Sequence, residues 1–144
     1  MIGGIFDFRQ RESKMGMYTE LIFGASLKED TPINVIDTLR YMVGDIDKLV
    51  EPAIDLDRNP LQGGSYSFGV NTPVSKLLFS ETTGEWMLSA RANIKNYCSS
   101  IEKFLEWIKP YISSGSGCRD MYAIVIYEED DTPTMHYLNS EESK

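Results

Sequence analysis

Apolar side chains recur at every second position in several segments, which is the spacing of a β-strand. Residues 17–28 put Leu21 and Phe23 on one face and Tyr18 and Glu20 on the other. A later strand has the clearest alternation, with an apolar face made of Trp86, Leu88, Ala90, Ala92 and Ile94. The other predicted strands are 75–81, the doubly apolar 121–127, and 133–138, whose initial proline suits an edge strand. The pattern predicts five strands.

Two other segments carry apolar residues at helical spacing. The first helix is expected over 32–43, because Thr31 before Pro32 is typical of an N-cap followed by proline at the first helical position. The second is expected over 100–112, after Ser99-Ser-Ile-Glu102, in which Ser99 and Glu102 would form a capping box. Pro110 lacks a backbone N–H and should bend the last turn of this helix.

The element order β-α-β-β-α-β-β predicts an α+β fold, a ferredoxin-like two-layer sandwich with an antiparallel sheet and both helices on one face. The other face would stay uncovered, lined by Tyr18, Arg91, Lys95 and one side of 121–127. A face that is half apolar and half charged is typical of docking on a partner or on a second copy of the chain. We expect a single domain over residues 17–140. Residues 1–16 would form an N-terminal extension, and residues 141–144 a short C-terminal tail.

Composition narrows the class of protein. The 144 residues are 42% hydrophobic and 11% aromatic, which is ordinary for a folded domain. No apolar run approaches the length of a membrane helix, and no signal peptide is evident. Cys98 and Cys118 flank a predicted helix and would lie too far apart to form a disulfide with each other. We therefore expect a cytoplasmic protein that does not bind membranes.

The formal net charge is −8, from 22 acidic and 14 basic residues, so the phosphate backbone of a nucleic acid is an unfavourable partner. The acids concentrate in 45–57 and in the segment after Arg119. One interpretation is a solvated surface, and the other is a surface complementary to a basic protein.

Few residues suggest catalysis. His136 is the single histidine, and its edge strand should turn it toward solvent, with no second histidine or cysteine at metal-binding spacing. A nucleophile elbow is absent from the sequence, and no cofactor motif is present. These features favour a protein that is not an enzyme, with no metal or cofactor.

Two loops are the main candidate binding sites. The segment 59–69 contains Tyr66 and Phe68, which serve either as a recognition surface or as core residues of a turn. The segment 113–120 ends in Arg119 and Asp120 and is either an anion-binding loop or a plain linker. Arg91 and Lys95 lie in a polar row of their strand that either contacts nucleic acid, in the manner of an open sheet that binds it, or is a solvated face.

Residues 59–69 and 114–123, together with the general plan from Met17 onward, resemble small uncharacterised proteins of bacteriophages and bacteria. This resemblance implies accessory roles in phage–host or toxin conflict. It carries no activity and no functional residue with it.

The sequence thus favours a non-enzymatic protein-interaction module, such as an inhibitor or immunity-like factor, that binds a basic partner. The alternative is a small-molecule or nucleotide-binding domain, with or without enzymatic activity, that uses the loops 59–69 and 113–120. A homodimer formed through the uncovered sheet face is a third possibility.

Overall fold

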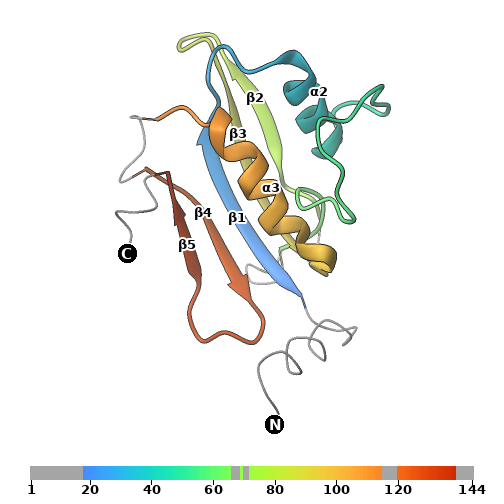
Figure 1. Ribbon diagram of the computed structural model, residues 1–144, viewed down its shortest axis with the longest axis vertical. Coiled ribbons are helices and arrows are strands. Elements are labelled where there is room, and N and C mark those ends of the chain that lie inside the picture. Colours follow the sequence, from blue (N-terminus) through green and yellow to red (C-terminus); the bar gives the residue numbers. More distant parts are fainter. Residues whose placement is uncertain (1–17, 66–68, 70–71, 115–119, 139–144) are drawn as a thin grey trace.

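The computed structural model describes residues 18–65, 69, 72–114 and 120–138. In these residues the chain forms an α+β domain with one five-stranded antiparallel sheet and two helices (Figure 1). The elements are β1 (Thr19–Ser26), α2 (Ile33–Met42), β2 (Lys76–Ser80), β3 (Glu85–Ile94), α3 (Ser100–Ile108), β4 (Met121–Tyr127) and β5 (Thr134–Tyr137). The predicted class and the predicted sequence of elements are confirmed.

The strands lie in the order β2-β3-β1-β4-β5, so β1 is central. Its partners are β3, where Leu21 lies opposite Ala92, and β4, where Leu21 lies opposite Val125. All three of these side chains are buried, which is the result expected when the apolar face of each strand turns toward one core.

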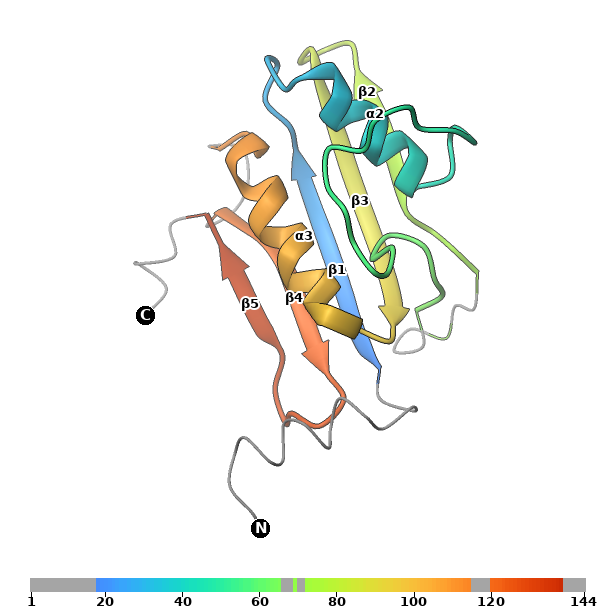
Figure 2. The same cartoon turned by 45° about the vertical axis from the view of Figure 1, so that its right-hand side comes forward.

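Both helices lie on the same face of the sheet. α3 lies over β1 and β4, whereas α2 lies over β3 and β2 (Figures 1 and 2). Their buried residues complete the core with the inner sheet face, and they are Val35, Ile36, Leu39 and Met42 of α2 and Ile101, Phe104, Leu105 and Ile108 of α3. The opposite sheet face carries neither helix.

The starts of the two helices differ from the sequence prediction. The Thr31 hydroxyl donates to the Lys28 carbonyl, and α2 begins after Pro32 without a side-chain cap. Ser99 adopts a left-handed conformation with φ 57° and also makes no capping bond. Asn96 takes over that role, because its Oδ1 accepts the Ile101 N–H at 2.8 Å.

The end of the second helix agrees better with the pattern. α3 stops at Ile108 and continues as a tighter 3₁₀ turn over Lys109–Tyr111, which contains Pro110. The last turn therefore departs from regular helix at this proline, as expected, because the ring nitrogen cannot donate to the helical ladder.

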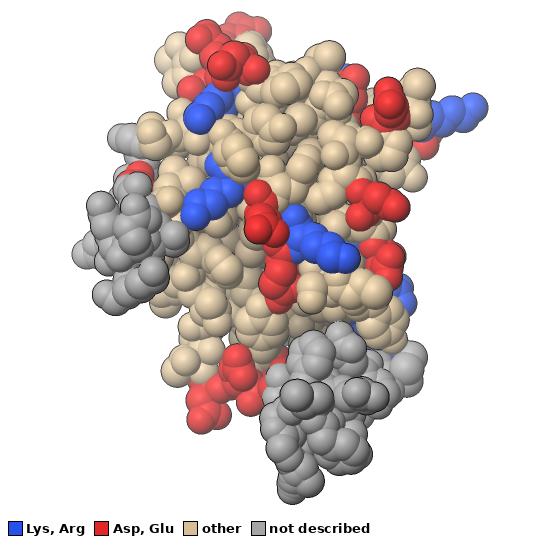
Figure 3. All heavy atoms as spheres, viewed as in Figure 1, with Lys and Arg blue, Asp and Glu red and all other residues tan. Residues whose placement is uncertain are grey.

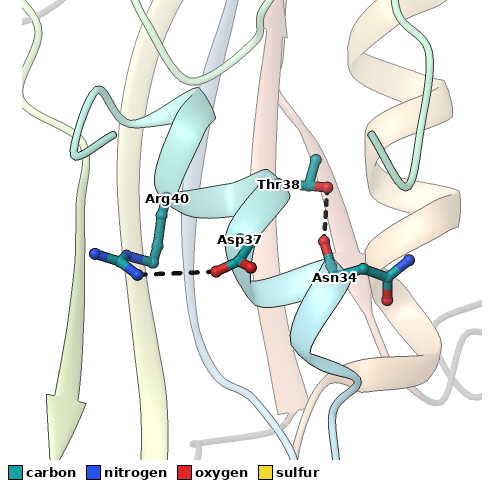
Figure 4. A network of polar contacts seen from close by, with 4 residues as sticks. All are labelled: Asn34, Asp37, Thr38 and Arg40. Carbon is teal, nitrogen blue, oxygen red and sulfur yellow. Dashed lines mark hydrogen bonds and ion pairs between the residues drawn. The ribbon is translucent and has the colours of Figure 1, made fainter. Parts of the chain in front are cut away.

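A long connection joins α2 to β2, and its described part contains no helix or strand. Thr38 ties this connection to α2, because its Oγ1 accepts the Ala53 N–H at 2.9 Å and donates to the Asn34 carbonyl (Figure 4). Asn59 ties it to the helix end by donating from Nδ2 to the Met42 carbonyl at 2.9 Å. These two attachments hold irregular backbone against the helix.

Candidate functional site

A cavity of about 430 Å³ lies where β3 ends and where the chain enters β1. It is lined by Tyr18, Arg58, Asn59, Gln62, Ile94 and Lys95, and we refer to it as the Arg58–Lys95 pocket. The segment 58–62 of the long connection forms one wall, and the residues at the sheet end form the other. Its lining among the described residues includes two cations and no acid.

The two cations lie over aromatic rings. The Arg58 guanidinium carbon lies 4.6 Å from the centre of the Tyr97 ring, and the Lys95 ammonium lies 5.7 Å from the centre of the Tyr18 ring. A cation above a ring is attracted by the ring's quadrupole but keeps its full charge. In the described part of the chain, neither cation forms an ion pair with a carboxylate.

Arg40 shows the contrasting case. Its guanidinium lies 3.8 Å from the Asp37 carboxylate, one turn earlier on α2 (Figure 4). The pair is exposed, so its energy is small, but the charge of Arg40 is balanced locally. Among the described residues, Arg58 and Lys95 have no such carboxylate partner.

The two amide side chains of the pocket differ in their hydrogen bonding. Asn59 is bonded through both its oxygen and its nitrogen, because its Oδ1 accepts the Leu61 N–H at 3.0 Å while its Nδ2 donates to the Met42 carbonyl. The Gln62 side chain makes no hydrogen bond to another described residue. It lies against Gly44, where φ is 91° and a Cβ atom would come within 2.7 Å of the Gln62 Nε2. Gly44 therefore gives Gln62 the space it occupies.

A second cavity, of about 470 Å³, lies between α2 and the long connection, and we refer to it as the α2 cavity. Its apolar lining is Tyr41, Met42, Leu49, Pro52, Ile54 and Leu56, and its polar lining is Thr38, Asp47, Lys48, Asp55, Arg58 and Asn59. Arg58 and Asn59 line both cavities, so the two cavities adjoin at these residues.

A buried carboxylate lies on the outer sheet face near the same end of the sheet. Glu20 is only 1% exposed, accepts a hydrogen bond from the Ser65 hydroxyl, and accepts another from Asn93 Nδ2 at 2.7 Å. The Gly64 carbonyl accepts the Asn93 N–H at 2.7 Å, so this network fixes residues 64–65 against β3. Alternation placed Glu20 on the face opposite Leu21 and Phe23, and Ser65 of the long connection covers it there.

The structure separates the residues that the sequence proposed for binding. Lys95 lines the pocket, whereas Arg91 is half-buried on the outer sheet face, opposite Ile22 in the β1–β3 register. Asp120 directly precedes β4, and its carbonyl accepts the Leu138 N–H at 2.9 Å. The remaining three, Tyr66, Phe68 and Arg119, lie outside the described residues.

The described parts of the two proposed loops are attached near opposite ends of β1. Gly64 bonds to Asn93, whose register partner is Glu20 at the beginning of β1. Ser113 bonds instead to the Ser26 carbonyl at the end of β1. The described parts of 59–69 and 113–120 are therefore not brought together.

Arg58 and Gln62 were not singled out from the sequence. Asn59 marked the start of a candidate loop, and an arginine directly before an Asn-Pro turn was the available signal. That signal is weak, because an arginine beside a turn is usually exposed to solvent.

His136 differs from its predicted orientation. It lies opposite the buried Ala123 in the β4–β5 register and is half-buried near the Tyr122 ring, whose centre is 6.1 Å away. Burial lowers the pKa of His136, the Glu102 carboxylate raises it, and Lys109 lowers it. Its Nε2 is buried and has no hydrogen-bond partner among the described residues. The expectation of a solvent-facing histidine is therefore wrong.

Tyr127 forms a second polar contact beneath α3. Its hydroxyl donates to Glu102, and burial, this hydrogen bond and nearby acidic charges all raise the pKa of Tyr127. The phenol therefore stays protonated. Asn96 donates to the other oxygen of Glu102 at 2.8 Å, so these contacts join the start of α3 to the sheet.

The outer sheet face carries exposed apolar side chains. Leu78 and Met87, register partners in β2 and β3, are 56% and 40% exposed, and Met135 of β5 is 49% exposed. On the helix-bearing face, acidic and basic side chains are interspersed and form no single acidic patch among the described residues (Figure 3).

No protein-family model matches the chain, and neither a curated protein nor a solved structure shows significant similarity to it. Among the described residues, His, Cys, Asp and Glu side chains do not assemble into groups of three or more that could hold a metal ion. The described helices include none with the length and apolar character needed to cross a membrane.

Proposed function

We propose that this protein binds a small organic anion in the Arg58–Lys95 pocket. The observation that carries the proposal is that one cavity holds two cations with no carboxylate partner among the described residues, in a chain whose formal charge is −8. In such a chain, a cavity whose described lining holds two cations and no acid is unusual enough to suggest a ligand. This is a narrower form of the alternative predicted from the sequence, in which a small molecule binds between the loops 59–69 and 113–120. The walls of the proposed site are instead residues 58–62 and the end of β3.

The geometry of the cations supports this proposal. Arg58 presents several fixed N–H donors that suit a carboxylate or phosphate, and Lys95 adds a compact second charge. Glu128 approaches the pocket wall, where its carboxylate accepts the Tyr18 backbone N–H at 2.6 Å.

The first test is thermal unfolding and calorimetric titration of the full chain with phosphate, pyrophosphate and citrate. We expect binding that weakens with salt and raises the melting temperature, because a ligand that binds only the folded state stabilises it. Arg58→Gln and Lys95→Gln should each weaken binding about tenfold or more, in line with the loss of one charge-assisted hydrogen bond.

Arg40→Gln is the matched control for Arg58, and Lys76→Gln is the control for Lys95. Arg40 already pairs with Asp37, and Lys76 is an exposed residue of β2. Both control variants should bind like the unchanged protein. Equal losses in controls and pocket variants would mean that only the overall charge matters, and the proposal would fail.

A second candidate function is the binding of a protein partner through the outer sheet face. The exposed pair Leu78 and Met87 supports it, because adjacent apolar side chains on an uncovered face are typical of an interface. The intermixed charges of the helix-bearing face offer less support for a basic partner that recognises an acidic patch. An inhibitor or immunity-like role is a narrower version of this candidate.

The oligomeric state tests this second candidate in its simplest form, the homodimer. Light scattering of the protein and of Leu78→Lys and Met87→Lys should show a dimer that the substitutions dissociate. A monomer at all concentrations would remove the homodimer and leave a different protein as the partner.

Two finer expectations belong to the same proposal. The order of the first four strands, β2-β3-β1-β4, with helices on one face supports a ferredoxin-like core to which β5 adds an edge strand. A cytoplasmic location is supported by the cysteine content, because the two cysteines of the chain are spaced in a way that does not suggest a disulfide between them.

A further inference from the structure

We propose that the ligand is a nucleoside phosphate, with its phosphate at Arg58 and Lys95 and its base and sugar in the α2 cavity. This inference rests on the proposed anion-binding function and extends it from a charge to a chemical class. Its basis is that Arg58 and Asn59 line both cavities, so the two cavities adjoin at these residues.

The α2 cavity suits a flat and largely apolar group. Tyr41 is 44% exposed although it lies on α2 beside the cavity, and Leu49, Pro52 and Ile54 come from the facing connection. An aromatic base can stack on the tyrosine ring and contact the aliphatic side chains opposite. Such contacts would cover apolar surface that now meets water.

The acids of the same cavity favour a base and sugar over a hydrocarbon chain. Asp47 and Asp55 both line it, and an ionised carboxylate only accepts hydrogen bonds. The amino groups of a base and the hydroxyls of a ribose are donors that satisfy these acceptors, whereas an acyl chain offers none.

The size of the site agrees with this class. Cavities of about 470 and 430 Å³ fall within the roughly 300–1,000 Å³ range of small-molecule sites. The charge also agrees, because the described lining of the Arg58–Lys95 pocket holds two cations and no acid, whereas the α2 cavity adds Asp47 and Asp55 to its cation Lys48.

The test compares calorimetric affinities of the full chain for inorganic phosphate, ribose 5-phosphate, the four common nucleoside 5′-monophosphates and octanoate. We expect at least one nucleotide to bind about tenfold or more tightly than ribose 5-phosphate, since stacking and new hydrogen bonds add to phosphate binding. Tyr41→Ala and Asp55→Asn should remove most of this difference between the nucleotide and ribose 5-phosphate.

The matched controls are Ile33→Ala, another exposed apolar residue of α2, and Asp57→Asn, an exposed acid of the same connection. Neither lines the described cavities, and both should leave nucleotide affinity unchanged. Circular dichroism verifies that each variant is folded.

The possible outcomes distinguish the nucleotide inference from the anion-binding function. If phosphate binds but no nucleotide exceeds ribose 5-phosphate, the nucleotide inference is wrong and the anion-binding function stands. Tighter binding of octanoate than of every nucleotide would also overturn the inference, in favour of an apolar acid. If none of these anions binds, the proposed function itself fails.

Discussion

The α3 and α2 halves of the helix layer are packed very differently. α3 closes tightly on β1, where the Phe104 and Phe23 rings meet edge-to-face at 5.7 Å and Ile101 is fully buried. α2 is bordered by the long connection, and both described cavities adjoin that connection. Both helices bury their apolar faces, but the described space for a ligand borders the connection that follows α2.

This difference originates in the segments that come after the two helices. α3 leads through a 3₁₀ turn to Ile112, which bridges to Leu27 at the end of the sheet. α2 leads into a segment with prolines at 52 and 60, which cannot continue a regular element. Irregular backbone packs less densely than a helix against a sheet, because its shape does not repeat.

The largest expected effect breaks the tightly packed half. Phe104→Ala removes a fully buried ring from contact with Phe23 and Trp107 and should lower the free energy of unfolding by about 3–5 kcal/mol. Leu78→Ala, on the exposed outer face, should cost only about 0.5 kcal/mol. Urea denaturation measures both, and similar values would contradict the placement of Phe104 in the core and of Leu78 on an exposed face.

The next effect concerns the attachment of the long connection. Thr38→Val keeps the side-chain shape but leaves the Ala53 N–H without its acceptor, which should cost about 1–3 kcal/mol. Hydrogen exchange should speed up at Ala53 more than in α3. Thr31→Val is the control, because its hydroxyl bond to Lys28 is exposed. Equal exchange at Ala53 in both variants would argue against the Thr38 anchor.

A smaller effect distinguishes the observed helix cap from the predicted one. Asn96→Ala removes the acceptor for Ile101 N–H and the donor to Glu102, and should cost about 1 kcal/mol. Ser99→Ala should cost less, since Ser99 makes no capping bond. Thermal denaturation of both variants tests this expectation. A larger loss of stability in Ser99→Ala than in Asn96→Ala would support the capping box that the sequence predicted.

The smallest expected effect is a pH dependence in the α3 half. The folded protein has a lowered His136 pKa, so below about pH 6.5 the unfolded chain binds more protons than the folded one. The contribution of neutral His136 is therefore complete above about pH 6.5 and declines as the pH falls toward the folded pKa. His136→Asn should flatten the stability curve between about pH 5 and 7.5, measured by urea denaturation; an unchanged slope would contradict this.

Local pattern was sufficient for most of the fold. Each of the five strands and both helices appears near its predicted bounds, because periodicities of two and 3.6 depend only on neighbouring residues. The predicted cap at Ser99 is wrong because Asn96, three residues earlier, accepts a backbone N–H at the start of the helix instead. Sequence rules for helix caps do not show which of two nearby polar residues accepts the backbone N–H.

The candidate site depended on contacts that are distant in sequence. Tyr18, Arg58 and Lys95 meet because β1 pairs antiparallel with β3 and the connection folds back over their shared end. The burial of Glu20 has the same origin, since Ser65 and Asn93 reach it only after that folding.

The sequence by itself determined the α+β class, the element order and the apolar face of each strand, because these follow from side-chain periodicity. The tertiary structure alone decided which cations of the pocket lack a carboxylate partner in the described part of the chain, and where the cavities lie. Ion pairing and cavity shape depend on distances between separate segments, and only chain packing sets those distances.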